Sequence, residues 1–266
     1  MALMTRIGFA IQVGAPESAV RSAAVAAQRV GFDSFWTNNP PGKDGVGLIA
    51  VAARVTDSIA LRTAVVPISH NQPAELRARL DALALPRSRY RLGLGSGAGP
   101  DAVRRMREAL GELRPSGFPL AVGALGPRML RLGGEAADGV VLSTLTPAYA
   151  RKSAGLVREA SERAGRPTPP VLAVVVIGYG PGAGERVEGA ARFMATLPQC
   201  QAHFARMGAT ARDTYAIAQG AEALAATLAS WRDIVDEVIV TPMLPPEQPD
   251  LALEALDALH SAWRSG

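Results

Sequence analysis

Short apolar runs alternate with longer amphipathic segments along the whole chain, which is the pattern of a parallel α/β protein. The apolar runs are continuous, as expected of strands that are buried on both faces. They predict strands over residues 6–12, 34–37, 59–66, 90–94, 120–122, 140–142, 170–179 and 238–241. Helical periodicity and cap residues predict helices over residues 16–30, 45–55, 73–83, 99–113, 127–132, 147–164, 185–207 with a break near Pro198, 220–230 and 251–263.

Eight similar strand units favour a closed (β/α)8 TIM barrel over an open doubly wound sheet, because no reversal of the strand order is evident. The length of 266 residues suits one such barrel, and no linker interrupts the pattern, so we expect a single domain over residues 1–266. Active sites of this fold lie at the carboxyl ends of the strands. The residues at those ends are Gln12, 37–39, 64–70, 95–97, 123–126, Ser143 and Thr144.

Residues 119–144 form the most informative segment, because they read as strand, glycine-rich turn, short helix, turn and strand. The turn covers residues 123–126, and Pro127 after it is typical of a helix start. Gly133 and Gly134 are interpreted as the end of that helix. The turn has two interpretations: its backbone amides bind a phosphate, or it is a tight turn that binds nothing.

Composition places the chain among globular proteins and excludes several function classes. Hydrophobic residues make up 48% of the chain and charged residues 20%, so a sizeable core can form. The longest apolar runs are too short to span a bilayer, and the first residues do not resemble a signal peptide. Cys200 is the only cysteine, which excludes an internal disulfide and suggests a reducing, cytoplasmic setting.

Charge and histidine spacing argue against nucleic acids and metals as partners. The net charge is +4, but the arginines that carry most of the positive charge are interleaved with acidic residues. Such a balance is compatible with an anionic small molecule as ligand. His70, His203 and His260 lack metal-ligand spacing, so we expect no metal site.

Five segments taken together resemble the luciferase-like monooxygenase family, in particular its branch that uses the deazaflavin coenzyme F420. They are GFDSFWTNN at 31–39, IALRTAVVPISHNQP at 59–73, YRLGLGSG at 90–97, residues 119–144, and WRDIVDEVIVTP at 231–242. Their order and spacing are more specific than any one of them, and the match covers most of the chain. The resemblance implies a TIM barrel, here a shortened one, that binds a flavin or deazaflavin at the strand ends.

The resemblance also implies which residues surround the coenzyme. In relatives that use coenzyme F420, the third strand ends in a bulge with a cis peptide bond behind the ring, and the matching bond here joins Ala64 and Val65. The fourth turn would approach the ribityl chain, and the amides of the glycine-rich turn would approach the phosphate. Arg128 either adds a cation there or is a solvated helix residue. The implied coenzyme-binding residues are Ala64, Val65, Ser69, Gly95, Ser96, Gly97, Ala124, Leu125 and Gly126.

Two positions depart from the acid-base residues that are usual in the family. Where members often have Asp-His after the second strand, this chain has Asn38 and Asn39, which cannot take a proton near neutral pH. Where members often have Arg-His before a proline, this chain has asparagine and glutamine, and His70 lies one position further upstream. We predict Asn38, Asn39 and His70 as the catalytic positions, with a surface-loop role as the other interpretation of His70.

These observations together predict a coenzyme F420-dependent oxidoreductase that transfers a hydride between the deazaflavin and a small organic substrate. One alternative is an FMN-dependent monooxygenase on the same fold. Another is a non-catalytic flavin- or deazaflavin-binding homologue, suggested by the two asparagines. A phosphate-binding isomerase or aldolase is a third alternative, but no lysine lies at a predicted strand end to form a Schiff base.

The segment over residues 99–117 supplies only one helix, whereas relatives usually carry a longer insertion that helps to cover the site. The pocket is therefore expected to be more open than in relatives, or closed by a partner chain. The apolar helix over residues 45–55 either forms a homodimer interface or packs on the barrel.

Overall fold

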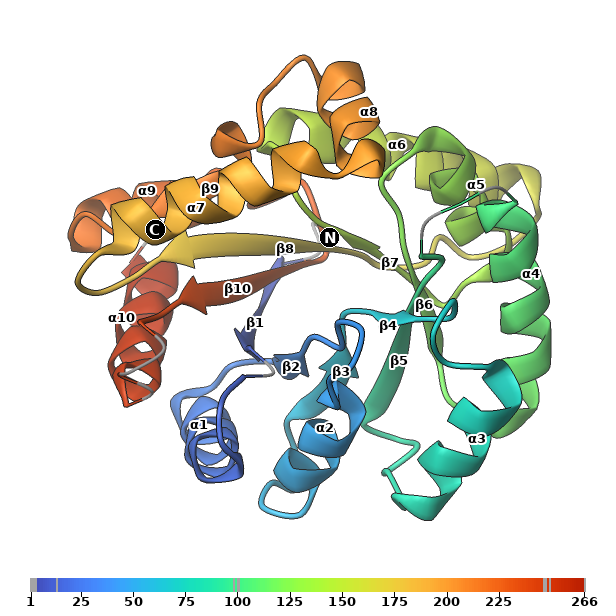
Figure 1. Cartoon of the computed structure of the whole chain (residues 1–266), viewed down its shortest axis with the longest axis horizontal. Coiled ribbons are helices and arrows are strands. Elements are labelled where there is room, and N and C mark those ends of the chain that lie inside the picture. Colours follow the sequence, from blue (N-terminus) through green and yellow to red (C-terminus); the bar gives the residue numbers. More distant parts are fainter. Residues whose placement is uncertain are drawn as a thin grey trace.

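The strands form a closed parallel barrel in the computed structural model, which describes residues 4–12, 14–97, 99, 101–245, 248 and 250–265. Neighbouring strands follow the order β10-β1-β2-β3-β5-β6-β7-β8, and β8 pairs with β10 to close the ring (Figure 1). The strands are β1 (Arg6–Ile11), β2 (Ser34–Thr37), β3 (Ala60–Thr63), β4 (Val66–Pro67), β5 (Tyr90–Gly95), β6 (Leu120–Gly123), β7 (Gly139–Leu142), β8 (Val171–Gly178), β9 (Tyr215–Ile217) and β10 (Glu237–Met243). The predicted (β/α)8 barrel is thus confirmed.

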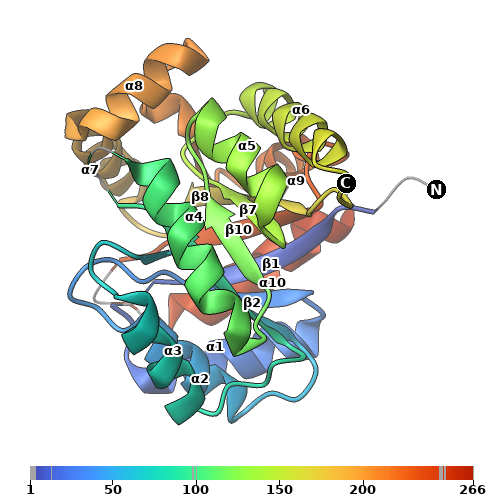
Figure 2. The ribbon, with the colours of Figure 1, turned by 90° about the vertical axis from the view of Figure 1, so that its right-hand side faces the viewer.

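Helices surround the barrel, and Figure 2 shows α7 and α8 together on the side toward which the strands run. The helices are α1 (Glu17–Val30), α2 (Gly45–Ala53), α3 (Pro73–Ala82), α4 (Ala102–Leu113), α5 (Pro127–Ala136), α6 (Pro147–Arg163), α7 (Ala183–Thr196), α8 (Pro198–Met207), α9 (Ala221–Ala229) and α10 (Leu251–Ser265). The predicted break near Pro198 is the boundary between α7 and α8. Within the described residues, no helix is long and apolar enough to cross a membrane.

The predicted strand over residues 59–66 is interrupted. β3 ends at Thr63, the peptide bond between Ala64 and Val65 is cis, and the two-residue strand β4 follows. The cis bond lies where the family resemblance implies it. The sequence pattern did not predict β9, whose three residues pair with the end of β8, nor the two 3-10 helices η1 (Arg114–Ser116) and η2 (Arg212–Thr214).

The prediction that Gly133 and Gly134 end a helix is wrong, because α5 continues through both glycines to Ala136. The two glycines instead permit close packing. A Cβ atom on Gly133 would lie 2.6 Å from a side-chain atom of Val140 on β7. A Cβ atom on Gly134 would lie 2.4 Å from the carbonyl oxygen of Val157, so α5 and α6 meet backbone to backbone.

Replacing Gly134 by alanine is expected to destabilise the protein by about 1–3 kcal/mol, because backbone atoms of α6 would have to move. Gly155→Ala is the matched control: Gly155 also lies inside a helix, α6, and a Cβ atom there would have no neighbour within 4 Å. That control is expected to gain about 0.5–1 kcal/mol from helix propensity. Urea unfolding measures both changes, and a gain in both variants would refute the packing explanation.

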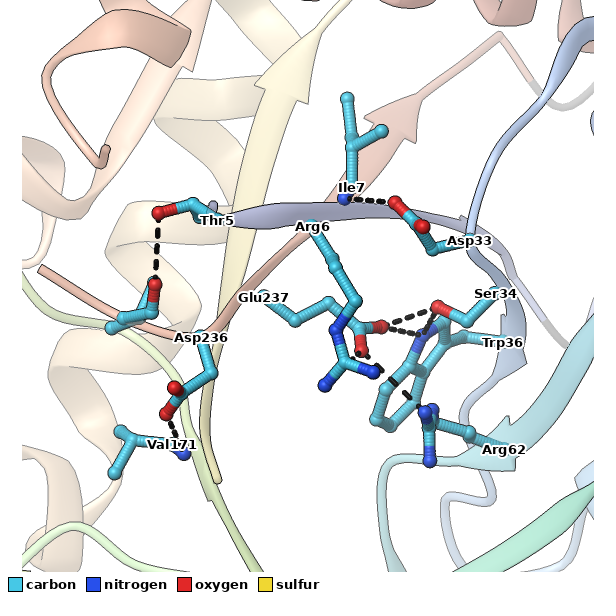
Figure 3. A network of polar contacts seen from close by, with 11 residues as sticks. Thr5, Arg6, Ile7, Asp33, Ser34, Trp36, Arg62, Val171, Asp236 and Glu237 are labelled. Carbon is cyan, nitrogen blue, oxygen red and sulfur yellow. Dashed lines mark hydrogen bonds and ion pairs between the residues drawn. The ribbon is translucent and has the colours of Figure 1, made fainter. Parts of the chain in front are cut away.

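An aspartate immediately precedes three barrel strands, β2, β7 and β10, and ties each to the start of a neighbouring strand. In each case the aspartate N–H donates to a backbone carbonyl, and the carboxylate accepts the N–H of that same residue. The pairs, with the two distances in that order, are Asp33 with Ile7 (2.9 and 2.8 Å), Asp138 with Leu120 (2.7 and 2.9 Å), and Asp236 with Val171 (2.8 and 2.7 Å). Figure 3 shows the first and the last of these pairs.

The amino-terminal end of the barrel interior is filled by a polar group that we call the floor cluster, formed by Arg6, Ser34, Trp36, Arg62 and Glu237 (Figure 3). The Glu237 side chain is fully buried, and its Oε2 lies 3.6 Å from Nη2 of Arg62 and 3.8 Å from Nη2 of Arg6. Its Oε1 accepts hydrogen bonds from the Ser34 hydroxyl and from Nε1 of Trp36. Glu237 therefore balances the buried guanidinium of Arg62 and the partly exposed guanidinium of Arg6.

The positive charge beside the floor cluster is energetically costly. Burial lowers the pKa of Arg62, and the nearby carboxylate of Glu237 opposes this shift. Burial, followed by repulsion from Arg62, lowers the pKa of Arg91 to about 10. Because burial disfavours the charged form of both guanidinium groups, each depends strongly on a nearby negative charge.

Candidate functional site

A cavity of about 1040 Å³ lies at the carboxyl end of the barrel. Its bottom is formed by side chains inside the barrel, among them Trp36, Val141, Val174 and Ile239. The Trp36 indole lines this cavity with its ring, and its N–H donates to Ser34 and Glu237 of the floor cluster. The cavity thus rests directly on the floor cluster, and it lies where TIM-barrel enzymes bind their ligands.

One wall of the cavity is built around Val65, which follows the cis peptide bond. A Cβ atom on Gly95 would lie 2.6 Å from Cγ2 of Val65, and one on Gly123 would lie 3.0 Å from its Cγ1. Because neither glycine carries a Cβ atom, the Val65 side chain can occupy the space between them. The result is a wall of one branched side chain and bare backbone, which suits the face of a flat ring.

Most of the predicted coenzyme-binding residues meet in this cavity. The predicted residues that line it are Asn38, Ala64, Val65, Gly95, Ser96, Gly97, Ala124, Leu125 and Gly126. They come from β2 and from the consecutive barrel strands β3, β5 and β6 with the loops that follow them. The structure brings these positions together, and their roles stay predictions.

Asn39 does not line the cavity. Its side chain is buried, and its Oδ1 accepts the backbone N–H groups of Gly45 at 2.8 Å and Val46 at 3.2 Å. These are the first residues of α2, whose N–H groups have no partner within the helix. The structure therefore gives Asn39 a structural explanation, which is to hold the loop after β2 against the start of α2.

Ser69 and His70 lie outside the cavity lining as well. Both are exposed, and Oγ of Ser69 lies 2.9 Å from Nδ1 of His70. A Cβ atom on Gly97 would lie 2.2 Å from Oγ of Ser69, so Ser69 packs against the turn that lines the cavity. The exposed position of His70 agrees with the surface-loop interpretation.

The mouth of the cavity is covered in part by α8 and β9, which come from the long connection between β8 and β10. Gln199, Ala202 and Arg206 of α8 line the cavity, as does Tyr215 of β9. This chain therefore supplies cover of its own at the place where an open or partner-closed pocket was expected. The sequence predicted the helix but gave no signal that it lies over the strand ends.

Arg206 is the only charged side chain among the lining residues that the structure describes. A Cβ atom on Gly126 would lie 3.5 Å from Nη2 of Arg206, so the guanidinium faces the start of α5. Positive charge and the amides of a helix start together favour an anion. Arg128, the cation considered from the sequence, is exposed and does not line the cavity.

The cavity offers little acid-base chemistry of its own, because no carboxylate or imidazole is among its described lining residues. The phenol of Tyr215 is the remaining titratable group there. Burial, followed by the nearby Cys200, raises the pKa of Tyr215, so the phenol keeps its proton at neutral pH. The described lining therefore supplies no carboxylate or imidazole as a general acid or base.

His203 connects α8 to the loops after β6 and β7. It is 1% exposed, with Nδ1 2.8 Å from the carbonyl oxygen of Leu125 and Nε2 2.9 Å from that of Thr144. Only a protonated imidazole can donate to two carbonyl groups. Burial opposes that proton more strongly than the two carbonyls favour it, so the pKa of His203 lies below its ordinary value.

We expect the free energy of unfolding to decrease as the pH falls below about 6.5, the ordinary pKa of histidine. The unfolded chain then takes up a proton that the folded His203 resists, so the stability present above pH 6.5 is lost as the pH falls toward the lowered pKa. His260, whose pKa is also lowered by burial, acts in the same direction. Denaturant unfolding of wild type and H203Q between pH 7 and 5.5 tests this: the variant should lose less stability, and equal slopes would exclude His203 as a source.

Comparison with known proteins links this geometry to one family. The profile of a family described as luciferase-like monooxygenase matches residues 1–115 and 110–265. An F420-dependent secondary alcohol dehydrogenase in complex with an F420-acetone adduct is similar in structure, with a TM-score of 0.74, 14% identity, and coverage of 96% of this chain and 99% of that one.

Two further solved structures are similar over nearly their whole length. The coenzyme F420-dependent tetrahydromethanopterin reductase from Methanopyrus kandleri has a TM-score of 0.71 and 15% identity, over 94% of this chain and 97% of that one. The oxygenating constituent of 3,6-diketocamphane monooxygenase from Pseudomonas putida, in complex with FMN, has a TM-score of 0.69 and 16% identity, over 98% and 97%. At these identities the likeness shows a shared fold.

Proposed function

Because the chain belongs to the luciferase-like monooxygenase family, we propose that it is an oxidoreductase that binds coenzyme F420 in this cavity and exchanges a hydride with a small organic substrate. The observation that carries the proposal is the cavity itself. The wall around Val65 is formed by one branched side chain and bare backbone, and Arg206 is the one cation among the described lining residues, facing the start of α5. A flat ring with a phosphate-bearing chain matches both features.

The residues present fit a deazaflavin or flavin. Bare backbone at Gly95 and Gly123 leaves the wall smooth enough for a ring, and the ribityl chain would run past Ser96. The phosphate would lie between Arg206 and the backbone of Leu125 and Gly126, where a guanidinium and a helix start attract an anion.

The protein's contribution to the reaction is to bind, orient and shield the reactants. The bound coenzyme supplies the hydride chemistry. Val65 in the wall and Trp36 at the bottom of the cavity would limit the orientation of a bound ring. The residues of α8 would limit the access of water at the mouth. The phenol of Tyr215 on β9 lines the cavity and keeps its proton at neutral pH.

FMN is the second candidate coenzyme, because its phosphate would meet the same cation. Two of the similar structures above are F420-dependent enzymes, and a third is a complex with FMN, so proteins of this fold use both coenzymes. The F420 proposal rests on the family branch that the sequence resembles.

Equilibrium titration with oxidised coenzyme F420 and, separately, with FMN tests the proposal through tryptophan fluorescence. Binding in the cavity is expected to quench Trp36, so W36F should lose more of the quenching than W263F, whose tryptophan lies on α10. Tighter binding of coenzyme F420 than of FMN, followed by substrate-dependent oxidation of its reduced form, supports the proposal. Binding of neither coenzyme would overturn it, and preference for FMN with oxygen consumption would favour the monooxygenase alternative.

A further inference from the structure

The lining of the cavity divides between two halves of the barrel. The wall and turns assigned to the coenzyme follow β3, β5 and β6, which are consecutive in the ring. The strands β8, β10 and β1 are also consecutive and form the half across from them. Apart from Val174 and Ile239 at the bottom of the cavity, their lining side chains have not been assigned a role above.

The side chains on β8 and β10 form two layers on the wall of this second half. Val174 lies beside Ile239 in the register of the two strands, and Val176 lies beside Thr241 one layer higher. Since neighbours in register point to the same face, both pairs face the cavity, and Met243 continues the row at the mouth. This half is therefore mainly apolar, and its polar lining groups, the hydroxyl of Thr241 and the amide of Gln12 after β1, carry no charge.

We infer that this half of the cavity, on β8, β10 and β1, is the substrate subsite and that it takes an uncharged, mainly apolar molecule; the substrate role rests on the proposed function. A charged substrate would lose its hydration here without gaining a counter-ion. Arg206 of α8 is the only charged group among the described lining residues, and its guanidinium faces the start of α5 on the coenzyme side. The volume of about 1040 Å³ lies at the upper end of the range for ligand pockets, which is compatible with a small molecule beside a coenzyme.

Two ligands of nearly equal shape test the charge requirement: cyclohexyl methyl ketone and cyclohexanecarboxylate. Ligand-observed NMR titrations at pH 7.5, with and without saturating FMN, measure both dissociation constants. We expect the ketone to bind at least about 30-fold more tightly than the carboxylate in both states. Equal affinities would overturn the inference, and so would displacement of the ketone by FMN, because the two halves would then be one site.

A new charge in the subsite tests its location. V176K is expected to reduce the preference for the ketone about 10-fold by supplying a counter-ion for the carboxylate, whereas V176M should keep the preference. M243K, with M243L as its control, repeats the test at the mouth, where a lysine is easily accommodated. An unchanged preference in the lysine variants that fold would mean that the ligands bind elsewhere, which overturns the inference.

Failure of the proposed function and failure of the subsite inference give different results in these titrations. If neither FMN nor coenzyme F420 binds the wild type, the coenzyme proposal fails, while the ketone and carboxylate titrations without coenzyme still test the subsite. If a coenzyme binds but the carboxylate matches the ketone, only the subsite inference fails. FMN affinity in V176K and V176M, measured by flavin fluorescence and expected within about 3-fold of wild type, confirms that the coenzyme half is intact.

Discussion

Replacing Glu237 by glutamine is expected to lower the free energy of unfolding by about 3–5 kcal/mol. The carboxylate is fully buried and lies 3.6 Å from the guanidinium of Arg62, which is itself almost fully buried. Glutamine keeps the shape and the hydrogen-bonding capacity of the side chain but removes the charge. The buried guanidinium of Arg62 would then lose its counter-ion, whereas Arg6 is partly exposed to solvent. Urea denaturation followed by circular dichroism measures the change.

Two further variants separate this charge effect from a general cost of substitution. E108Q makes the same chemical change in an exposed ion pair on α4 and should leave the free energy of unfolding unchanged within error. R62M combined with E237L removes both charges and should recover much of the stability lost in E237Q. Equal losses in E237Q and E108Q, or no recovery in the double variant, would show that the floor cluster does not depend on charge balance.

Replacing Arg206 by glutamine is expected to weaken FMN binding about 10- to 100-fold and to leave riboflavin binding nearly unchanged. Arg206 is the only cation among the described lining residues, and it faces the turn at Gly126. Riboflavin has the same ring and ribityl chain but no phosphate, so it does not use this charge. The difference between the two ligands reports the phosphate contact alone. The affinity of wild type for FMN should also fall with added salt more steeply than that of R206Q.

R128Q is the matched control for this experiment. Arg128 lies in the first turn of α5, near the same turn, but it is exposed and does not line the cavity. We expect R128Q to bind FMN almost as wild type does. A larger loss in R128Q than in R206Q would place the phosphate outside the cavity. A loss of riboflavin affinity as large as that of FMN would mean that R206Q distorts α8.

The fold could be predicted from the sequence because its strands are buried on both faces and so appear as continuous apolar runs. Short helices and turns between them then allow few topologies. The errors have local causes. Two consecutive glycines are typical of a helix end. The contacts that require Gly133 and Gly134 are with β7 and α6, which no local pattern reveals. β9 was missed because its three residues are only half buried.

The candidate site was predicted where it depends on loops next to strand ends, and missed where it depends on a distant segment. Gly95 and Leu125 follow strands that the pattern identifies, so topology alone brings them together. Arg206 enters the cavity only because α8 folds back over the mouth, and one arginine among many gives no signal of this. Asn39 looked catalytic by position, yet its amide is used to hold the start of α2.

The pairing of β1 with β10 has a consequence for synthesis of the protein. β1 forms one edge of the barrel until β10 exists. The two strands then pair in register, for example Ile7 beside Val238, and the Thr5 hydroxyl just before β1 donates to the carbonyl of Val235 just before β10. On the ribosome, β1 is made more than 200 residues before its second partner. Until then the backbone N–H and C=O groups on this edge of β1 lack their strand partner, and such an unpaired edge favours aggregation.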